Sequence, residues 1–253
     1  GYKALFNNTA DENLAIGVFA LNSNTSGIQN TGVGFNVLDV NQTGNNNTAL
    51  GHKALQNITV DANTAVGSQA LRFNSTGAEC TAMGYQSLQA NLADNNTAVG
   101  SRSLMSTTTG TDNTACGYFS LTTNTNGYNN TAIGSVSLRF NTTGIQNTAS
   151  GFYALTNNTT GNNNTAIGSA ALKTNKYGGG NTGLGCNTDV SDTSFFNATA
   201  IGYGADCNAS NKVRIGNTSV TVIEGQVAFT FPSDMRIKDE IEPLNENILN
   251  FVS

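Results

Sequence analysis

The sequence predicts an all-β fold, a parallel β-solenoid of about twelve coils with 16–17 residues each. Three observations carry this prediction. A short phrase recurs at nearly constant spacing, the positions around it keep their residue types, and each shortened coil also changes its turn residue. A period in the teens is shorter than that of helix-pair repeats. It fits one solenoid coil made of two short strands and two turns.

The recurring phrase is close to "NTAIG", which stands at residues 130–134 and 164–168. Its last glycine serves as an anchor for aligning the coils. Consecutive anchors are 17 residues apart, except for two gaps of 16. The anchors are Gly17, Gly34, Gly51, Gly67, Gly84, Gly100, Gly117, Gly134, Gly151, Gly168, Gly185 and Gly202.

Aligned on the anchor, the coils show columns of constant residue type. The residue before the anchor is Ile, Val, Leu or Met in ten of twelve coils, with Cys116 and Ser150 as exceptions. The next residue back is always Ala or Gly, and Asn stands four before the anchor in ten coils. Leu stands four after it from Leu21 to Leu172. Stacking at ~4.8 Å turns columns into ladders. We expect two apolar ladders in the core and Asn side chains bonded along the stack.

The turns follow the same logic. Glycine stands ten residues after the anchor in most coils, and we expect it to supply a positive φ. Both 16-residue coils have Asp in that slot, at Asp61 and Asp94. Asp also tolerates the left-handed region and closes turns on itself. The loss of one residue and the change from Gly to Asp therefore occur together in each short coil, and together they keep the ladders in register.

Composition limits the functional classes. The net charge of −5 argues against nucleic acid as a partner, and no apolar run approaches the ~20 residues of a membrane span, so we expect no membrane insertion. His52, the single histidine, is expected at the surface, and Cys116 is expected to be a buried thiol. Without a CxxC motif or a second histidine, we expect no metal and no cofactor. A Ser-His-Asp site is disfavoured for the same reason.

The two ends of the chain differ from the repeat. Gly1–Leu5, "GYKAL", matches the second half of a coil, so we expect further chain upstream. After Gly202 the columns end. We therefore divide the chain into a repeat domain at 1–204 and a β-strand neck at 205–232. Residues 233–253 form the start of a third, helical segment. Alternating apolar and polar residues at 211–231 indicate the neck strand.

The repeat resembles the YadA-like head repeat of trimeric adhesins, over roughly residues 1–204. Here Thr replaces the usual Ser of that family's phrase. The resemblance implies a left-handed parallel β-roll in which three chains associate about a threefold axis. A homotrimer is also physically reasonable, because a thin coil alone buries little surface.

The segment from Ser233 resembles the start of the endosialidase-type intramolecular chaperone, which is found behind viral tail fibres and spikes. The family pattern S-D-x-R-x-K-x-x-I is met by Ser233, Asp234, Arg236, Lys238 and Ile241. The resemblance implies trimerisation, assisted folding and self-cleavage before Ser233. Ser233 would be the nucleophile and Lys238 the base, with Asp234 in support. The family domain continues well beyond the residue corresponding to Ser233, so only its start is represented here.

Three functional hypotheses follow. The favoured one is a homotrimeric tail fibre or spike of a virus, located on the virion and binding a host-surface glycan or protein receptor. The alternative is a bacterial surface adhesin or extracellular filament subunit. The third, an enzyme acting on glycans, needs carboxylates clustered in a groove, whereas the acidic residues here stand singly at turns. We expect no external substrate beyond the single-turnover cut at Ser233.

Overall fold

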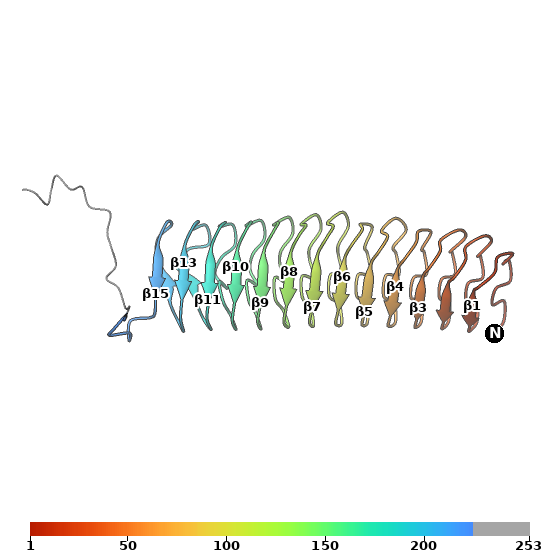
Figure 1. The fold of residues 1–253 in the computed structure, drawn as a ribbon, viewed down its shortest axis with the longest axis horizontal. Helices are drawn as coiled ribbons and strands as arrows, with labels where there is room; N and C mark the ends of the chain where they lie inside the picture. The colour runs from red at the N-terminus through yellow and green to blue at the C-terminus, as the bar shows by residue number, and fades with distance from the viewer. Residues whose placement is uncertain (225–253) are drawn as a thin grey trace, which may run out of the picture. The chain divides into compact units, whose positions relative to one another are not determined.

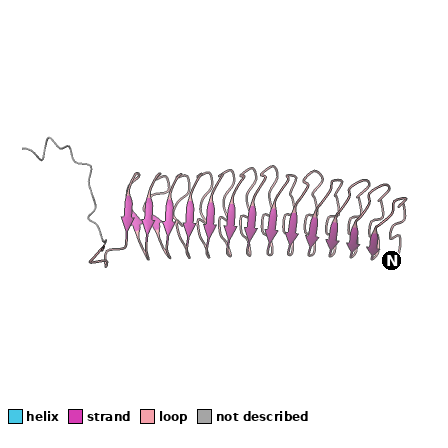
Figure 2. Ribbon diagram, viewed as in Figure 1, coloured by secondary structure: helices cyan, strands magenta, loops and turns pink. Residues whose placement is uncertain are grey.

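The computed structural model describes residues 1–224, and residues 1–219 form one elongated stack of coils (Figure 1). The predicted parallel β-solenoid is confirmed: successive coils supply the strands of one 13-stranded sheet. The described residues contain no helix (Figure 2). The strands of this sheet are β1 Leu14–Ile16, β2 Thr31–Val33, β3 Thr48–Leu50, β4 Thr64–Val66, β5 Thr81–Met83, β6 Thr97–Val99, β7 Thr114–Cys116, β8 Thr131–Ile133, β9 Thr148–Ser150, β10 Thr165–Ile167, β11 Thr182–Leu184, β13 Thr199–Ile201 and β15 Val213–Ile215.

The register between coils follows the anchor alignment. Thr131 pairs with Thr148 and Ala132 with Ala149, so equivalent residues stand directly above one another. The short coils keep this register. Most coils have one strand where two were expected. A second sheet contains only β12 (Asp189–Val190) and β14 (Asp206–Cys207). Elsewhere the backbone after the anchor takes left-handed φ values and cannot extend.

The leucine column forms the centre of the core, as predicted. Every leucine of this column, four residues after the anchor from Leu21 to Leu172, is fully buried. Their backbone is unusual, because φ is about +50° throughout, for example 48° at Leu138. A left-handed L-residue costs roughly 1–2 kcal/mol, whereas burying a leucine side chain gains roughly 1.5–3 kcal/mol. The Leu138 N–H also donates to the Ala154 carbonyl of the next coil at 3.0 Å. Burial and the coil-to-coil hydrogen bond together offset the strain.

The anchor glycines stack on one another. At Gly134, φ is 122°, and a Cβ there would lie 2.6 Å from the Gly151 carbonyl oxygen of the next coil. The alanine column, including Ala132 and Ala149, is buried and faces the leucines. Small residues are required on this wall because the leucine side chains fill the interior.

The second predicted apolar ladder is not in the core, which corrects the sequence-based assignment. Ile133 is 47% exposed and Ile167 is 42% exposed. In a three-residue strand the side chains alternate between the two faces. Because the central Ala points inward, the flanking Thr and Ile must point outward. The periodic pattern identified a column without identifying its side of the sheet.

Two further assignments change for related reasons. Cys116 occupies this outward column and is exposed, so the prediction of a buried thiol was wrong. Val136 stands in a column that looked variable, yet it is only 7% exposed. The adjacent members of that column, Phe119 and Tyr153, are half-buried aromatic residues. His52 is exposed, as predicted.

The asparagine ladder is confirmed, and a second one accompanies it. Asn130 donates from its backbone N and its Nδ2 to Oδ1 of Asn113, at 3.0 and 3.1 Å. Seven residues after the anchor a second buried column forms the same chain, with Asn141 Nδ2 donating to Asn124 Oδ1 at 2.9 Å. The Gly144 carbonyl accepts from Asn130 and from Asn141, each at 2.9 Å. The buried amides are thus paired both along the stack and within each coil.

The turn glycines serve close packing rather than positive φ. Gly27 does not have a left-handed φ, and a Cβ there would lie 2.4 Å from the Gly44 carbonyl oxygen. In the short coils Val60 and Ala93 take this place, and Ala62 and Asn95 adopt the left-handed conformation that was expected of Asp61 and Asp94. The aspartates instead accept hydrogen bonds from backbone N–H groups of the preceding coil, for example Asp61 from Asn45 at 2.7 Å.

The stack continues past the last repeat of the phrase. Strand β15 pairs in parallel with β13, and Gly216 N donates to the Ile201 carbonyl at 2.7 Å. The coil geometry therefore continues beyond the last repeat of the sequence pattern. Backbone hydrogen bonds can extend the stack where the side chains no longer repeat. The rest of the neck segment from residue 225, and the helical start at 233–253, lie outside the described residues.

Candidate functional site

The first candidate surface is an apolar stripe on the outer side of the sheet. We call it the outer apolar face; it consists of the residue before each anchor glycine, together with Ile215 before Gly216 in the following coil. Its members are exposed or half-buried along the whole stack, so no other part of residues 1–224 covers them. The apolar members are Ile16, Val33, Leu50, Val66, Met83, Val99, Ile133, Ile167, Leu184, Ile201 and Ile215.

Aromatic side chains flank this face on the other side of the anchor glycine. Phe35, Tyr85, Tyr118 and Phe152 directly follow their anchors and are 43–55% exposed. His52 stacks on Phe35 with the ring centroids 5.7 Å apart. Contiguous exposed apolar surface of this extent marks a site of macromolecular contact.

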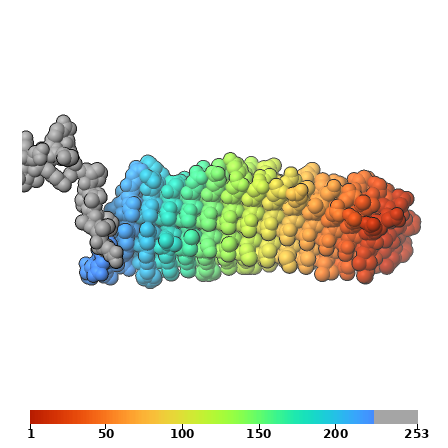
Figure 3. All heavy atoms as spheres, viewed as in Figure 1, coloured from red at the N-terminus to blue at the C-terminus, as the bar shows by residue number. Residues whose placement is uncertain are grey.

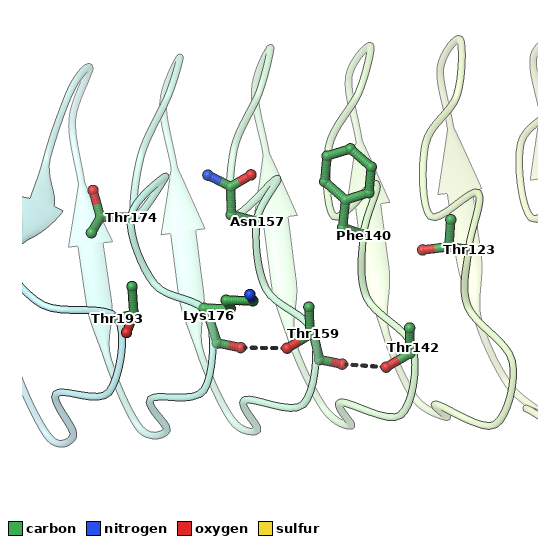
Figure 4. Close-up of a pocket in the computed structure, with 8 residues that line it drawn as sticks. All are labelled: Thr123, Phe140, Thr142, Asn157, Thr159, Thr174, Lys176 and Thr193. Atoms are coloured by element: carbon green, nitrogen blue, oxygen red, sulfur yellow. Dashed lines mark hydrogen bonds between the residues drawn. The ribbon is translucent and has the colours of Figure 1, made fainter.

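The second candidate is a longitudinal groove across five coils near the C-terminal half of the stack. Figure 3 shows the surface as parallel ridges, one per coil. The groove crosses these ridges between two columns, six and eight residues after the anchor, and its volume is 570 Å³. In the close-up the two columns form facing rows (Figure 4), with Thr123, Phe140, Asn157 and Thr174 in one row and Thr142, Thr159, Lys176 and Thr193 in the other.

Most polar groups of the groove have already used their donors. Thr142 Oγ1 donates to the Thr159 carbonyl at 3.0 Å, and Thr159 Oγ1 donates to the Lys176 carbonyl at 3.1 Å (Figure 4). Thr123 Oγ1 donates to the Arg139 carbonyl at 2.8 Å. Asn157 Nδ2 donates to the Lys173 carbonyl at 2.9 Å. These threonine oxygens can now only accept, whereas the Asn157 amide keeps a second N–H, so the walls offer mainly acceptors and methyl groups.

The charge around the groove differs from that of the whole chain. Residues 113–188 contain three basic residues, Arg139, Lys173 and Lys176, and no Asp or Glu. Asp189 lies beside the groove and accepts from Thr174 Oγ1 at 2.8 Å, and burial raises the pKa of its carboxyl. Asp192 is exposed next to Thr193 at the C-terminal end. Of the three basic residues only Lys176 lines the groove, and the first acidic residue, Asp189, lies beside Thr174, which is in the same coil as Lys176.

Phe140 is the one aromatic ring that lines the groove, and it belongs to a cation–aromatic ladder. The Arg139 guanidinium lies 4.8 Å from the Phe119 ring centroid and 5.0 Å from that of Phe140. Arg102 lies between Tyr85 and Phe119 in the same way, at 5.8 and 5.3 Å. Such contacts orient the rings at the surface. Phe140 is held in place and still 42% exposed.

The four cysteines are free thiols. Cys80 interrupts the first asparagine ladder and is buried, and this burial raises the pKa of its thiol to about 11. Its Sγ accepts from Asn91 Nδ2 at 3.3 Å. A raised thiol pKa suppresses the nucleophilic thiolate.

We expect Cys80 to resist thiol reagents at pH 8 while the protein is folded and to react on unfolding in urea. Both the burial of its sulfur and its raised pKa act in this direction. The measurement is the rate at which each thiol reacts with a disulfide-exchange reagent, and the variant Cys80→Ser identifies which slow reaction belongs to Cys80. Rapid labelling of Cys80 in the folded protein would contradict the buried position.

The residues singled out for self-cleavage, Ser233, Asp234 and Lys238, lie outside the described residues. Within residues 1–224 no group of three or more His, Cys, Asp or Glu side chains could hold a metal ion. No helix in the same range is long and apolar enough to cross a bilayer.

Sequence reasoning missed the groove, although the sequence carries signals for it. The dipeptide Arg-Phe occurs at residues 72–73 and again at 139–140, four coils apart in the same columns. The acid-free stretch from 113 to 188 is a second signal. Neither signal shows that the two columns face each other across a furrow.

In the comparisons with known proteins, no family model and no curated protein matches the chain.

Proposed function

We propose that this chain forms the rod of a homotrimeric viral tail fibre or spike that attaches the virion to the host surface. The outer apolar face carries the proposal. It runs the length of the stack, and the packing of a single chain does not use it. Homo-oligomers with closed symmetry are the usual way to cover such a face. The number three comes from the resemblance to YadA-like heads.

The extent of the face favours association along the rod rather than at one end. About twelve coils at ~4.8 Å give a stripe roughly 58 Å long. Because the exposed members repeat in every coil, a parallel arrangement in register would place equivalent residues of neighbouring chains at the same level. Burying several such side chains contributes ~25 cal/mol per Å² of apolar area.

We expect the protein to sediment as a trimer of about 79 kDa, three times 26.2 kDa, and Ile133→Asp combined with Ile167→Asp to convert it to monomers. Both side chains lie on the outer apolar face, so the variant should keep its solenoid circular-dichroism spectrum. The matched control is Thr143→Asp, an exposed position outside this face. A stable wild-type monomer, or dissociation by the control alone, would refute the interface.

Attachment itself needs a separate test. Antibodies raised against residues 1–224 should label the tail fibres or spikes of virions in electron micrographs. Labelling of a bacterial surface in uninfected cells would instead support the adhesin alternative.

We further propose that the fibre is matured by a single self-cleavage before Ser233. The support is the S-D-x-R-x-K-x-x-I pattern at 233–241, which follows the fibre-like repeat after the neck at 205–232. Ser233 would attack the preceding carbonyl with Lys238 as its base and Asp234 in support. This reaction occurs once per chain and makes no use of an external substrate or cofactor.

A further inference from the structure

We propose that the groove from Thr123 to Thr193 binds a linear acidic glycan lying along the solenoid axis. The proposal rests on the attachment function above and names the receptor class for one site of the rod. None of the groove residues belongs to the outer apolar face, so the two surfaces can be tested separately.

The hydrogen-bonding character of the groove identifies the ligand class. The hydroxyls of Thr123, Thr142 and Thr159 donate to carbonyls of the next coil at 2.8 to 3.1 Å, and one of the two Asn157 N–H groups does the same at 2.9 Å. The remaining lone pairs need a ligand rich in donors. A polysaccharide carries many hydroxyl donors, whereas the backbone of a nucleic acid presents mainly phosphate acceptors.

The apolar parts of the groove fit the same ligand. The C–H face of a pyranose packs on an aromatic ring, and Phe140 presents one that is 42% exposed. The threonine methyl groups extend this apolar surface on both sides. Cation–aromatic contact with Arg139 at 5.0 Å restrains the ring before binding, which lowers the entropy lost on complex formation.

The spacing of the coils favours a glycan over a peptide. The groove repeats its wall residues every ~4.8 Å over roughly 19 Å. This step is close to the length of one extended monosaccharide unit. Side chains on one face of an extended peptide recur at roughly 6.6–6.8 Å, which does not match the coil step.

Lys176 favours an acidic group on the ligand. It is a half-buried groove residue whose ammonium can only donate. Its Nζ lies 5.1 Å from the Tyr177 ring centroid, and Figure 4 shows the side chain extending toward the coil of Thr159. With no Asp or Glu between residues 113 and 188, a carboxylate or sulfate of the ligand is its natural partner. Asp189, which is bonded to Thr174 in the coil of Lys176, and Asp192 oppose an acidic group in the last two coils of the groove.

The chain contains an internal control for this site. Arg72 lies 4.7 Å from the Phe73 ring centroid, and Phe73 is 44% exposed, so this pair reproduces Arg139 and Phe140 four coils away. Its surroundings differ, because Glu79 stands in the same coil and Asp61 and Asp94 stand in the two adjacent coils. Phe73→Ala therefore removes the same ring from an acidic setting.

The experiment measures binding of the purified protein to a panel of linear polysaccharides by isothermal titration calorimetry. The panel holds a polyuronate, a polysialate, a sulfated glycan and a neutral glucan, together with single-stranded DNA. We expect an acidic glycan to bind in a salt-dependent manner. Phe140→Ala and Lys176→Gln should each weaken that binding by about tenfold or more, and Phe73→Ala should leave it unchanged.

Each other outcome overturns the proposal. These outcomes are no binding to any acidic glycan, equal binding of the neutral glucan, tighter binding of DNA, or equal loss in Phe73→Ala. Sedimentation of the same samples separates the two claims. Trimers that bind no glycan refute this inference and leave the assembly proposal standing, whereas glycan-binding monomers refute the assembly alone.

Discussion

Leu138→Asp is expected to abolish cooperative folding of the coils around it. Leu138 is fully buried in the leucine ladder, and an uncompensated charge there costs several kcal/mol or more. Typical domains are stable by only about 5–15 kcal/mol. In a solenoid each coil is stabilised by its neighbours, so one disrupted coil also weakens those on either side. Thermal melting followed by circular dichroism measures the effect.

The controls separate burial from strain and from assembly. Leu138 has φ 48°, and Asp tolerates that conformation better than Leu does, so a loss of folding would arise from the buried charge. Leu138→Met should keep most of the stability. Ile133→Asp places the same charge on the outer apolar face and should leave each solenoid folded. Val136 is unsuitable as an exposed control because it is nearly buried. Equal melting temperatures for Leu138→Asp and wild type would contradict the core assignment.

Ser233→Ala is expected to abolish self-cleavage of the chain expressed through its natural stop codon. A serine hydroxyl is a weak nucleophile and needs a base, and a lysine can serve when burial or nearby charge lowers its pKa. The proposed step transfers the acyl group of Pro232 from nitrogen to the Ser233 oxygen, and water then hydrolyses the ester. Wild type should yield a fragment ending at Pro232 on a denaturing gel, identified by mass spectrometry.

Two variants test the assigned roles. Lys238→Ala should remain whole, and Lys238→Arg should also remain whole because a guanidinium stays protonated. The double variant Ile133→Asp and Ile167→Asp asks whether assembly of the rod is required for the cut. If wild type forms trimers and yet stays whole, the self-cleavage proposal is wrong and Ser233 is a linker residue.

The sequence by itself determined the fold class, the coil period and the register. A 17-residue spacing with constant columns leaves few alternatives to a stacked coil. The leucine ladder and the first asparagine ladder could be predicted because each is a column of one residue type. Their burial is confirmed for Leu21 to Leu172 and for Asn30 to Asn181. Repetition in the chain translates directly into repetition along the stack.

Only the tertiary structure decided which columns face inward. The phrase places Ala between Thr and Ile, and both apolar residues could have been assigned to the core. The strand must point them to opposite sides, and the leucines leave room for Ala alone. The groove likewise depends on two columns, those of Phe140 and Thr142, which lie on either side of the buried Asn141 column and face each other (Figure 4). Sidedness and concavity arise from how the coil closes on itself, which residue spacing along the chain does not encode.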